Sequence, residues 1–487
     1  MPEKMSSMGT KRPSPVVYGI ETEYSCLLTF PGHVEYELAG SCHNTDGFLG
    51  QYVDPENSGG SKIPSLALRL ATEDQGMQMN ENGMLSNGAR FYIDPSGFEY
   101  DTPETTTAEE AVHRMFDGDK FLLNALLKLS RDETIERFQL NRHIIDHNGS
   151  SRGIHLNTVI SSDHQTPSPK AVMLLATLNV AKGALFGSGG LLIDHDREVT
   201  EYHHSPRLSI TTDIKRDYID FSRRPLVRLP FKPDYAGLRR VESVTSDALN
   251  FGWPLRASLV LTNAVTGLIE MGYTDSLPLL YEESAVQSAQ NVGKNGPEGI
   301  VKLEKGSKPQ TASAVGVLRY IAEYALAVDG AEDYLDAESK QVIPEIIEVA
   351  DLAKQDIYLV GRDVESVARL AAMERQMEET KTTLDSEKIC RFDYKWDKIG
   401  GGTAEMMRAK GSVGWRGFSH SVVKPSEAKR RLVTPPQDTR ARIRGAVIDV
   451  EQGQDESTWN IIKTHEVEAE LHPLDHDLQA FLNTHDL

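Results

Sequence analysis

The chain has 487 residues and a formal net charge of −20, from 72 Asp and Glu against 52 Lys and Arg. This length exceeds one typical domain of roughly 100–200 residues, so we expect one large domain with insertions and a smaller one after it. The acidic balance argues against a nucleic-acid-coating protein, which needs a basic surface, and no segment approaches the ~18 apolar residues of a membrane span.

The three cysteines, Cys26, Cys42 and Cys390, lie far apart and lack C-x-x-C spacing. They predict neither a disulfide framework nor a zinc site, so a reducing cytoplasm is the expected location. Residues 1–14 contain basic side chains but no apolar stretch of the kind that forms a signal peptide. We expect them to form a disordered tail.

The first regular element is a strand over 16–30, whose residues alternate between polar and apolar. The next segment, 31–80, is rich in Gly, Ser, Asn and Asp and predicts a long, mobile insertion loop. A second strand with period-2 character follows at 88–94 (GARFYID).

Helical patterns dominate the rest of the chain, with a β-like piece at 153–161 among them. They cover 106–130, 168–186, 254–271, 310–328 and 341–383. Glycines at 400–402 and the stretch GSVGWRGFSHS predict a linker. Strands first and long helices later indicate an α+β protein, with a large domain over 15–410 and a small one over 425–487.

The two predicted strands carry charged side chains at alternate positions. Period 2 places Glu21 and Glu23 on one face of the first strand, and Arg90, Tyr92 and Asp94 on one face of the second. Glu99 can return to the same place through a turn. Such a face suits a hard cation such as Mg²⁺ beside a phosphate held by arginine. An ordinary solvated sheet face is the alternative.

Longer motifs favour the metal and phosphate site over the solvated sheet face. The segments that carry them are GIETEY (19–24), SNGARFYIDPSGFEYDTPE (86–104), SSRGIHLNTVI (150–160), QTASAVGVLRYIAEYA (310–325) and TPPQDTRARIRG (434–445), with Trp459 downstream. Together they resemble the Pup ligase and depupylase family, whose catalytic domain is related to glutamine synthetase. The resemblance implies an antiparallel sheet cradle packed on helices, with a small C-terminal domain that contributes to the nucleotide site.

The resemblance also implies roles for single residues. Asp94 matches the catalytic aspartate. The residues implied or proposed as magnesium ligands are Glu21, Glu23, Tyr92, Glu99 and Glu242. The cofactor, ATP or ADP with phosphate, would be bound by Arg90, Thr102, His155, Arg240 and Trp459. His155 could contact a metal or a phosphate, and a buried structural histidine is the alternative.

The chain departs from the family pattern in three places. His155-Leu156-Asn157 stands where the family has His-Glu-Asn, and Arg240-Val241-Glu242 where it has Arg-Leu-His. Either Glu242 restores an oxygen ligand lost at Leu156, or the two changes are unrelated. The stretch 403–432 is also shorter than in the family, in a region that helps to shape the tag-binding surface.

Three functions are compatible with these motifs. The favoured one is hydrolysis of amide or isopeptide bonds in a small acidic Pup-like modifier and in tagged proteins, because the 31–80 insertion and the Asp94–Glu99 spacing resemble the depupylase branch. The spelling GIETEY is closer to the ligases, which form the isopeptide bond at the expense of ATP. The third is a divergent nucleotide-hydrolysing or phosphatase-like relative that handles no tag. No nucleic-acid or membrane partner is expected.

Overall fold

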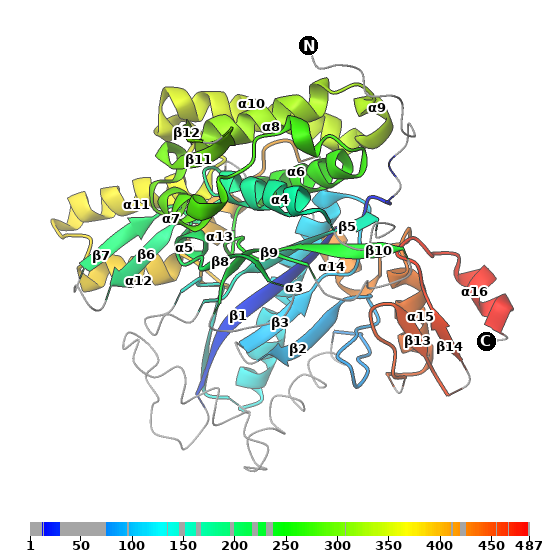
Figure 1. Ribbon diagram of the computed structural model, residues 1–487. Helices are drawn as coiled ribbons and strands as arrows, with labels where there is room; N and C mark the ends of the chain where they lie inside the picture. The colour runs from blue at the N-terminus through cyan, green and yellow to red at the C-terminus, as the bar shows by residue number, and fades with distance from the viewer. Residues whose placement is uncertain are drawn as a thin grey trace.

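The computed structural model describes most of the chain (Figure 1). The described residues are 12, 14–29, 75–94, 97–133, 135–145, 151–161, 167–194, 199–216, 223–229, 237–306, 308–410, 413–418, 425–453, 455–465 and 467–485. The predicted insertion loop lies outside them except for 75–80, and so does most of the predicted N-terminal tail.

Within the described residues, one mixed sheet of eight strands forms the centre of the molecule. Its strands are β1 (Gly19–Thr29), β2 (Arg90–Asp94), β3 (Gly97–Asp101), β4 (Arg137–Asn141), β5 (Ile154–Ser161), β8 (Asp213–Arg216), β9 (Pro225–Arg228) and β10 (Leu238–Ser243). Their order is β2-β3-β1-β5-β10-β9-β8, with β4 paired to the far end of β1. All neighbours are antiparallel except β8 and β9.

The other described strands form separate two-stranded hairpins. These are β6 (Gly190–Asp194) with β7 (Val199–His203), β11 (Ile300–Lys305) with β12 (Lys308–Ser313), and β13 (Ile461–Lys463) with β14 (Glu468–Glu470).

Helices alternate with the strands along the chain, and α3, α4 and α6 pack on one face of the central sheet. They are α3 (Ala108–Arg131), α4 (Pro169–Lys182), α5 (Pro206–Ser209), α6 (Gly252–Glu270), α7 (Ala285–Asn295), α8 (Ala314–Ala327), α9 (Ala331–Tyr334), α10 (Ala337–Gln355), α11 (Glu365–Thr380), α12 (Glu387–Trp396), α13 (Thr403–Ala409), α14 (Pro425–Val433), α15 (Ala441–Val450) and α16 (Leu478–His485). The short 3₁₀ helices are η1 (Thr274–Ser276), η2 (Glu282–Ser284), η3 (Gly296–Glu298) and η4 (Ile357–Val360).

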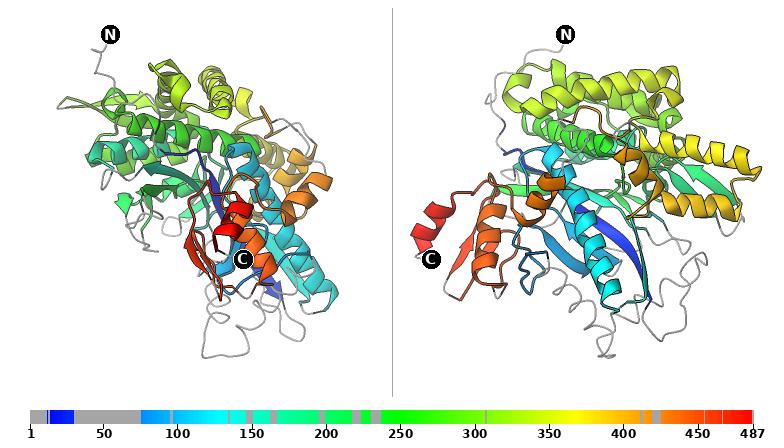
Figure 2. Two further views of the ribbon diagram at one scale, coloured as in Figure 1. Left: turned by 90° about the vertical axis from the view of Figure 1, so that its right-hand side faces the viewer. Right: turned by 180° about the vertical axis from the view of Figure 1, so that it is seen from behind.

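The long helix α3 shows why the sequence folds locally as it does. Thr107 caps its N-terminus by accepting a hydrogen bond from the backbone N–H of Glu110, and acidic residues fill the first turn. Its apolar side packs behind the sheet, as the view from behind shows (Figure 2, right). There Phe121 meets Phe91 of β2 edge-on at 5.5 Å between ring centroids. The apolar face of β2, which its alternating sequence predicts, therefore lies in a buried core.

The predicted α+β class is confirmed, and two local predictions need correction. The helical pattern over 341–383 is interrupted, because Asp356 caps η4 between α10 and α11. Arg12, placed in the predicted disordered tail, is buried: its guanidinium donates to Glu270 at 2.9 Å and to Asn263 Oδ1 at 2.7 Å. No helix among the described residues has both the length and the apolarity needed to cross a membrane.

The predicted linker also packs closely where it is described. Phe418 is buried in the main core with Trp415 against it, and the guanidinium of Arg256 donates to the Gly417 carbonyl at 2.5 Å. The C-terminal elements α15, β13, β14 and α16 enclose a small core of their own, made of Ile443, Val447, Ile462, Val467, Leu471 and Phe481. The division into a large and a small domain stays a prediction, to which this core lends support.

Leu156 lies on the apolar face of β5, fully buried in the main core. Leu156→Glu would bury an unpaired carboxyl group there, and we expect a loss of at least about 3 kcal/mol in the free energy of unfolding, measured in urea. Leu127→Glu, at an exposed leucine of α3, is the matched control. Equal stability of the two variants would contradict the assignment of Leu156 to the core.

Candidate functional site

The face of the sheet opposite the helices lines a cavity of about 450 Å³. Acidic side chains project into the cavity from the centre of the sheet, and arginine side chains surround them. The acidic residues of the lining are Glu21, Glu23, Glu99, Asp101 and Glu104. The arginines are Arg90, Arg207, Arg216, Arg223, Arg224, Arg228, Arg240 and Arg440. In a chain of net charge −20, this concentration of guanidinium groups favours a polyanionic ligand.

Strand register explains why these side chains meet. Glu21 of β1 stands opposite Asp101 of β3 and opposite His155 of β5. Two residues further along β1, Glu23 stands opposite Glu99, which in turn faces Tyr92. Because side chains alternate across a strand, all of them project from one face. The two strands that carry these residues, β1 and β2, lie in one sheet with β3 between them.

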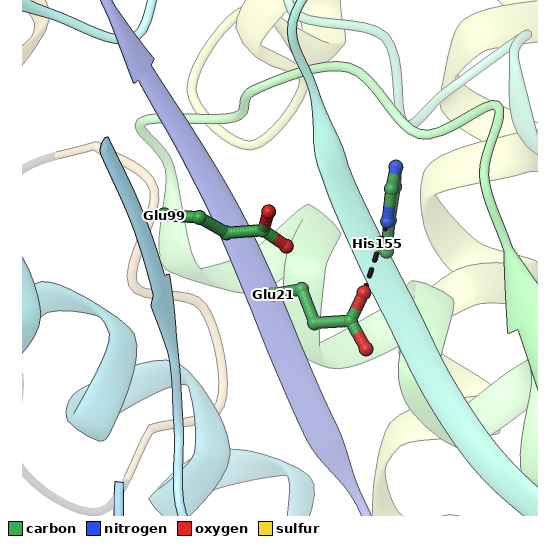
Figure 3. A group of neighbouring side chains, drawn as sticks. All are labelled: Glu21, Glu99 and His155. Atoms are coloured by element: carbon green, nitrogen blue, oxygen red, sulfur yellow. Dashed lines mark hydrogen bonds and ion pairs between the residues drawn. The ribbon is translucent and has the colours of Figure 1, made fainter. Parts of the chain in front are cut away.

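Three donors converge closely enough for one metal ion. Glu21, Glu99 and His155 each offer one ligand atom, and these atoms lie within 4.8 Å of one another. Figure 3 shows the three side chains converging from β3, β1 and β5. Tyr92 is hydrogen-bonded to Glu99. Glu23 lies beside the group, where its Oε2 accepts a hydrogen bond from the Gly153 backbone N–H at 2.6 Å.

The electrostatics of the carboxyl groups also fit a cation. Burial and the neighbouring Glu21 raise the pKa of Glu99 to about 8. Burial, Glu21 and Glu99 together raise the pKa of Asp101 well above its usual range. Asp101 Oδ1 is buried, and no hydrogen-bond partner for it occurs in the part of the chain that the structure describes. A divalent cation would offset this repulsion, and carboxylate oxygens are the ligands that Mg²⁺ prefers.

His155 is held by protein groups at both ring nitrogens. Its Nδ1 lies 3.0 Å from an oxygen of Glu21 and 3.0 Å from an oxygen of Glu242. Its Nε2 lies 3.2 Å from Nη2 of Arg207. Although burial lowers it, hydrogen bonds to the two carboxylates raise the pKa of His155 overall. The geometry therefore favours His155 as a partner that orients Glu21, and its assignment to the cofactor stays a prediction.

Glu242 lies behind His155 rather than among the residues that line the cavity. It is fully buried, with Arg228 Nε at 3.1 Å from its Oε2. Burial works against ionisation, yet Arg240 and His155 lower the pKa of Glu242 to about 2. Leu156 points into the core on the other side of the sheet. The two positions therefore do not exchange one ligand role, and metal ligation by Glu242 receives no support from its contacts.

The other candidate nucleotide contacts all line the cavity. Arg90 lies over the Tyr92 ring, with 4.1 Å from its Cζ to the centroid. Arg240 pairs with Glu21 through Nη1. Thr102 is buried, and its hydroxyl accepts a hydrogen bond from the Ile20 N–H at 3.0 Å. Trp459 reaches the cavity from the C-terminal elements, far from the sheet in sequence.

Asp94 is the last residue of β2, two positions after Tyr92 and opposite Gly97. Its side chain lies outside what the structure describes. The backbone thus places Asp94 at the end of the strand that carries Arg90 and Tyr92, and its catalytic role stays a prediction.

Sequence reasoning missed Asp101 and Arg207. The period-2 step from Glu99 could have identified Asp101. No local pattern points to Arg207, which is brought to the site by the short helix α5. Its guanidinium donates to the Val244 carbonyl at 2.6 Å and approaches Glu23 at 3.4 Å. Gly153 leaves room for it, because a Cβ there would lie 2.5 Å from Arg207 Nη1.

Known proteins share this architecture. The family model described as Pup-ligase protein matches residues 16–463. A Pup deamidase/depupylase of Mycolicibacterium smegmatis is 25% identical over 374 residues, which cover 75% of this chain and 71% of the relative. A Pup–protein ligase of Kineococcus radiotolerans is 24% identical over 405 residues, which cover 77% of this chain and 81% of the relative.

Two solved structures have the same fold. The complex between the prokaryotic ubiquitin-like protein Pup and its ligase PafA gives a TM-score of 0.74 at 18% identity, covering 98% of this chain and 93% of that chain. PafA in complex with ADP gives 0.68 at 18% identity, covering 87% and 93%. The fold implied by the motifs is confirmed.

The metal assignment predicts a pH-dependent affinity. Because the pKa of Glu99 is raised to about 8, cation binding must displace a proton, so Mg²⁺-dependent ATP affinity should rise as the pH approaches about 8 and then level off. Glu99→Gln should lower the affinity by roughly tenfold or more and flatten this rise, as measured by calorimetry. Glu387→Gln, at an exposed site, is the control. A wild-type affinity that ignores pH would contradict the assignment.

The tight contact at Gly153 gives a second test. Gly153→Ala should displace the Arg207 guanidinium, the flexible partner in the clash, and so remove it from Glu23 and His155. If Arg207 helps to bind the anionic ligand, ATP affinity should fall by roughly tenfold, the scale of one charge-assisted hydrogen bond. Gly361→Ala, where the nearest atom to a Cβ lies at 3.6 Å, should leave it unchanged. An unaltered affinity in Gly153→Ala would remove Arg207 from the binding site.

Proposed function

The chain belongs to the Pup-ligase family, and on that premise we propose that it is a Mg²⁺- and ATP-dependent hydrolase of amide and isopeptide bonds in a Pup-like modifier. The observation that carries this proposal is the cavity itself. Carboxyl groups suited to a cation stand at its centre, and arginines suited to phosphates surround them.

Each cavity residue then has a definite task. Glu21 and Glu99, with Tyr92 and Glu23 beside them, would hold Mg²⁺, which neutralises phosphate charge and polarises the oxygens that it binds. Arg90 and Arg240 would bind the nucleotide phosphates through their planar guanidinium groups. The ADP complex of the related PafA supports a nucleotide in this fold.

The hydrolytic step would fall to Asp94. As a general base, its carboxylate takes a proton from water while the water oxygen attacks the amide carbonyl carbon; the C–N bond breaks, and the leaving nitrogen receives a proton. In the nucleophilic variant, Asp94 attacks the carbonyl itself, the amine leaves, and water then hydrolyses the anhydride. Both variants require a carboxylate at position 94.

Ligation is the second candidate function. The ligase-like spelling GIETEY in β1 and the similarity to the Kineococcus ligase favour it. In this case ATP would phosphorylate a terminal glutamate carboxyl group of the modifier, a substrate lysine would displace the phosphate, and Asp94 would accept the lysine proton. The modifier and its tagged proteins are partners in both cases, and the scattered thiols favour the cytoplasm as the location.

The Asp94→Asn variant tests the catalytic proposal. It keeps the volume of the side chain while removing charge and basicity, so ATP affinity should change little while turnover falls by ~10²–10⁴-fold, as on loss of a general base. Turnover would be measured on a modifier ending in Gly-Gly-Gln, on a modifier–lysine conjugate, and on a modifier ending in Gly-Gly-Glu with a protein acceptor. Asp275→Asn, at an exposed residue, is the control.

The three substrates separate the functions. Release of ammonia or lysine supports the hydrolase, and conjugate formation with the third substrate supports the ligase. ATP consumption without either product would support the divergent nucleotide-hydrolysing reading. Full turnover in Asp94→Asn with intact ATP binding would exclude Asp94 as the catalytic residue.

A further inference from the structure

The C-terminal elements bring one aromatic ring to the cavity, that of Trp459. One side of this ring is covered by Arg444 of α15, whose Cζ lies 4.8 Å from the ring centroid. The same guanidinium donates to the Trp459 carbonyl through Nη1 at 2.7 Å. Arg444 therefore contacts both the ring and the backbone of this residue, and a flat ligand can stack only on the opposite face.

Arg444 is itself fixed from the side of the sheet. It is fully buried, and its Nη2 donates to Glu104 Oε2 at 2.7 Å and to the Gly88 carbonyl at 2.6 Å. Glu104 follows β3 and also accepts from Arg440 Nε at 2.6 Å. The central sheet thus contacts α15 through one carboxylate that is paired with two arginines.

The backbone reinforces this contact. Gly88 has a φ of +84°, and a Cβ there would lie 2.7 Å from Ala441 at the start of α15. The hydroxyl of Thr439 donates to the Glu104 carbonyl at 2.9 Å. These contacts at the start of α15, together with the hydrogen bonds from Arg444 to Glu104 and Gly88, leave the guanidinium little freedom. The plane of the group, and with it the Trp459 ring, is therefore set relative to the sheet that carries the acidic cluster.

We propose that Arg444 is a positioning residue for base recognition: held by Glu104, it fixes the Trp459 ring as the wall on which the base of the bound nucleotide stacks. The inference rests on the proposed function, since it requires a nucleotide in the cavity. On this proposal, two groups of residues contribute separately to the affinity for the nucleotide. The sheet and its arginines bind the phosphates, whereas the Arg444–Trp459 pair binds the base.

A comparison of ATP with inorganic triphosphate tests whether different residues bind the base and the phosphates. In the presence of Mg²⁺, Arg444→Met should weaken ATP by roughly tenfold, the scale of one base–aromatic stack, and leave inorganic triphosphate unchanged, both measured by calorimetry. A general loss of structure would weaken both ligands alike. Arg442→Met on the same helix is the matched control, because Arg442 bonds the His476 carbonyl at the surface; it should bind both ligands as the wild type does.

A double variant shows whether Arg444 acts through the ring. Trp459→Ala should cause a similar selective loss of ATP affinity, and the double variant Arg444→Met, Trp459→Ala should lose no more than Trp459→Ala alone. Additive losses, or equal weakening of ATP and triphosphate, would overturn the proposal.

If Arg444→Met fails to fold, Arg444→Lys keeps a charge for Glu104 but lacks the planar group, and the same selective loss is expected. A wild type that binds triphosphate but not ATP would contradict base recognition, and one that binds neither would refute the proposed function.

Discussion

Glu21 of β1 and Glu99 and Asp101 of β3 project from one face of the sheet, and the mutual repulsion of these carboxyl groups is the constraint that the site must satisfy. The ligand atoms of Glu21 and Glu99 lie within 4.8 Å of each other, and two charges at such a distance, in surroundings with an effective dielectric constant of about 20, repel by roughly 3 kcal/mol. The chain meets this cost in part by protonation, as the raised pKa values of Glu99 and Asp101 show, and in part by surrounding arginines. A divalent cation would offset the remaining repulsion.

The buried pair of His155 and Glu242 belongs to the same balance. Glu242 adds a further anion behind the cluster, and its charge is compensated by Arg228, Arg240 and the imidazole. Because the Nδ1–H of His155 faces two carboxylates, the ring links the cavity acid Glu21 to the buried acid Glu242. This departure from the family pattern therefore changes the charge that surrounds Glu21 without adding a residue to the cavity wall.

The C-terminal elements complete the site from a distance. They have a small core of their own, yet Glu104 joins them to the sheet. Burial raises the pKa of Glu104, but the neighbouring Arg444 and Arg440 outweigh this effect and lower the pKa to about 2. The carboxylate thus stays ionised across the pH range in which the acidic cluster titrates. An ion pair of this kind, buried and shared by two arginines, links the sheet to the C-terminal core while the carboxyl groups of the acidic cluster change their protonation.

The amino-acid sequence by itself determined the α+β class, most helices, and the face of β1 and β2 on which Glu21, Glu23, Arg90 and Tyr92 lie, because the alternation of side chains along a strand is a local property of the backbone. The motifs also carried the family. Only the tertiary structure decided that β3 lies between β1 and β2, that Leu156 faces the core, and that Arg207, Glu242 and Arg444 meet residues of distant segments. Register between strands and the docking of α5 and α15 depend on which apolar surfaces pack against each other, and no short stretch of sequence contains that information.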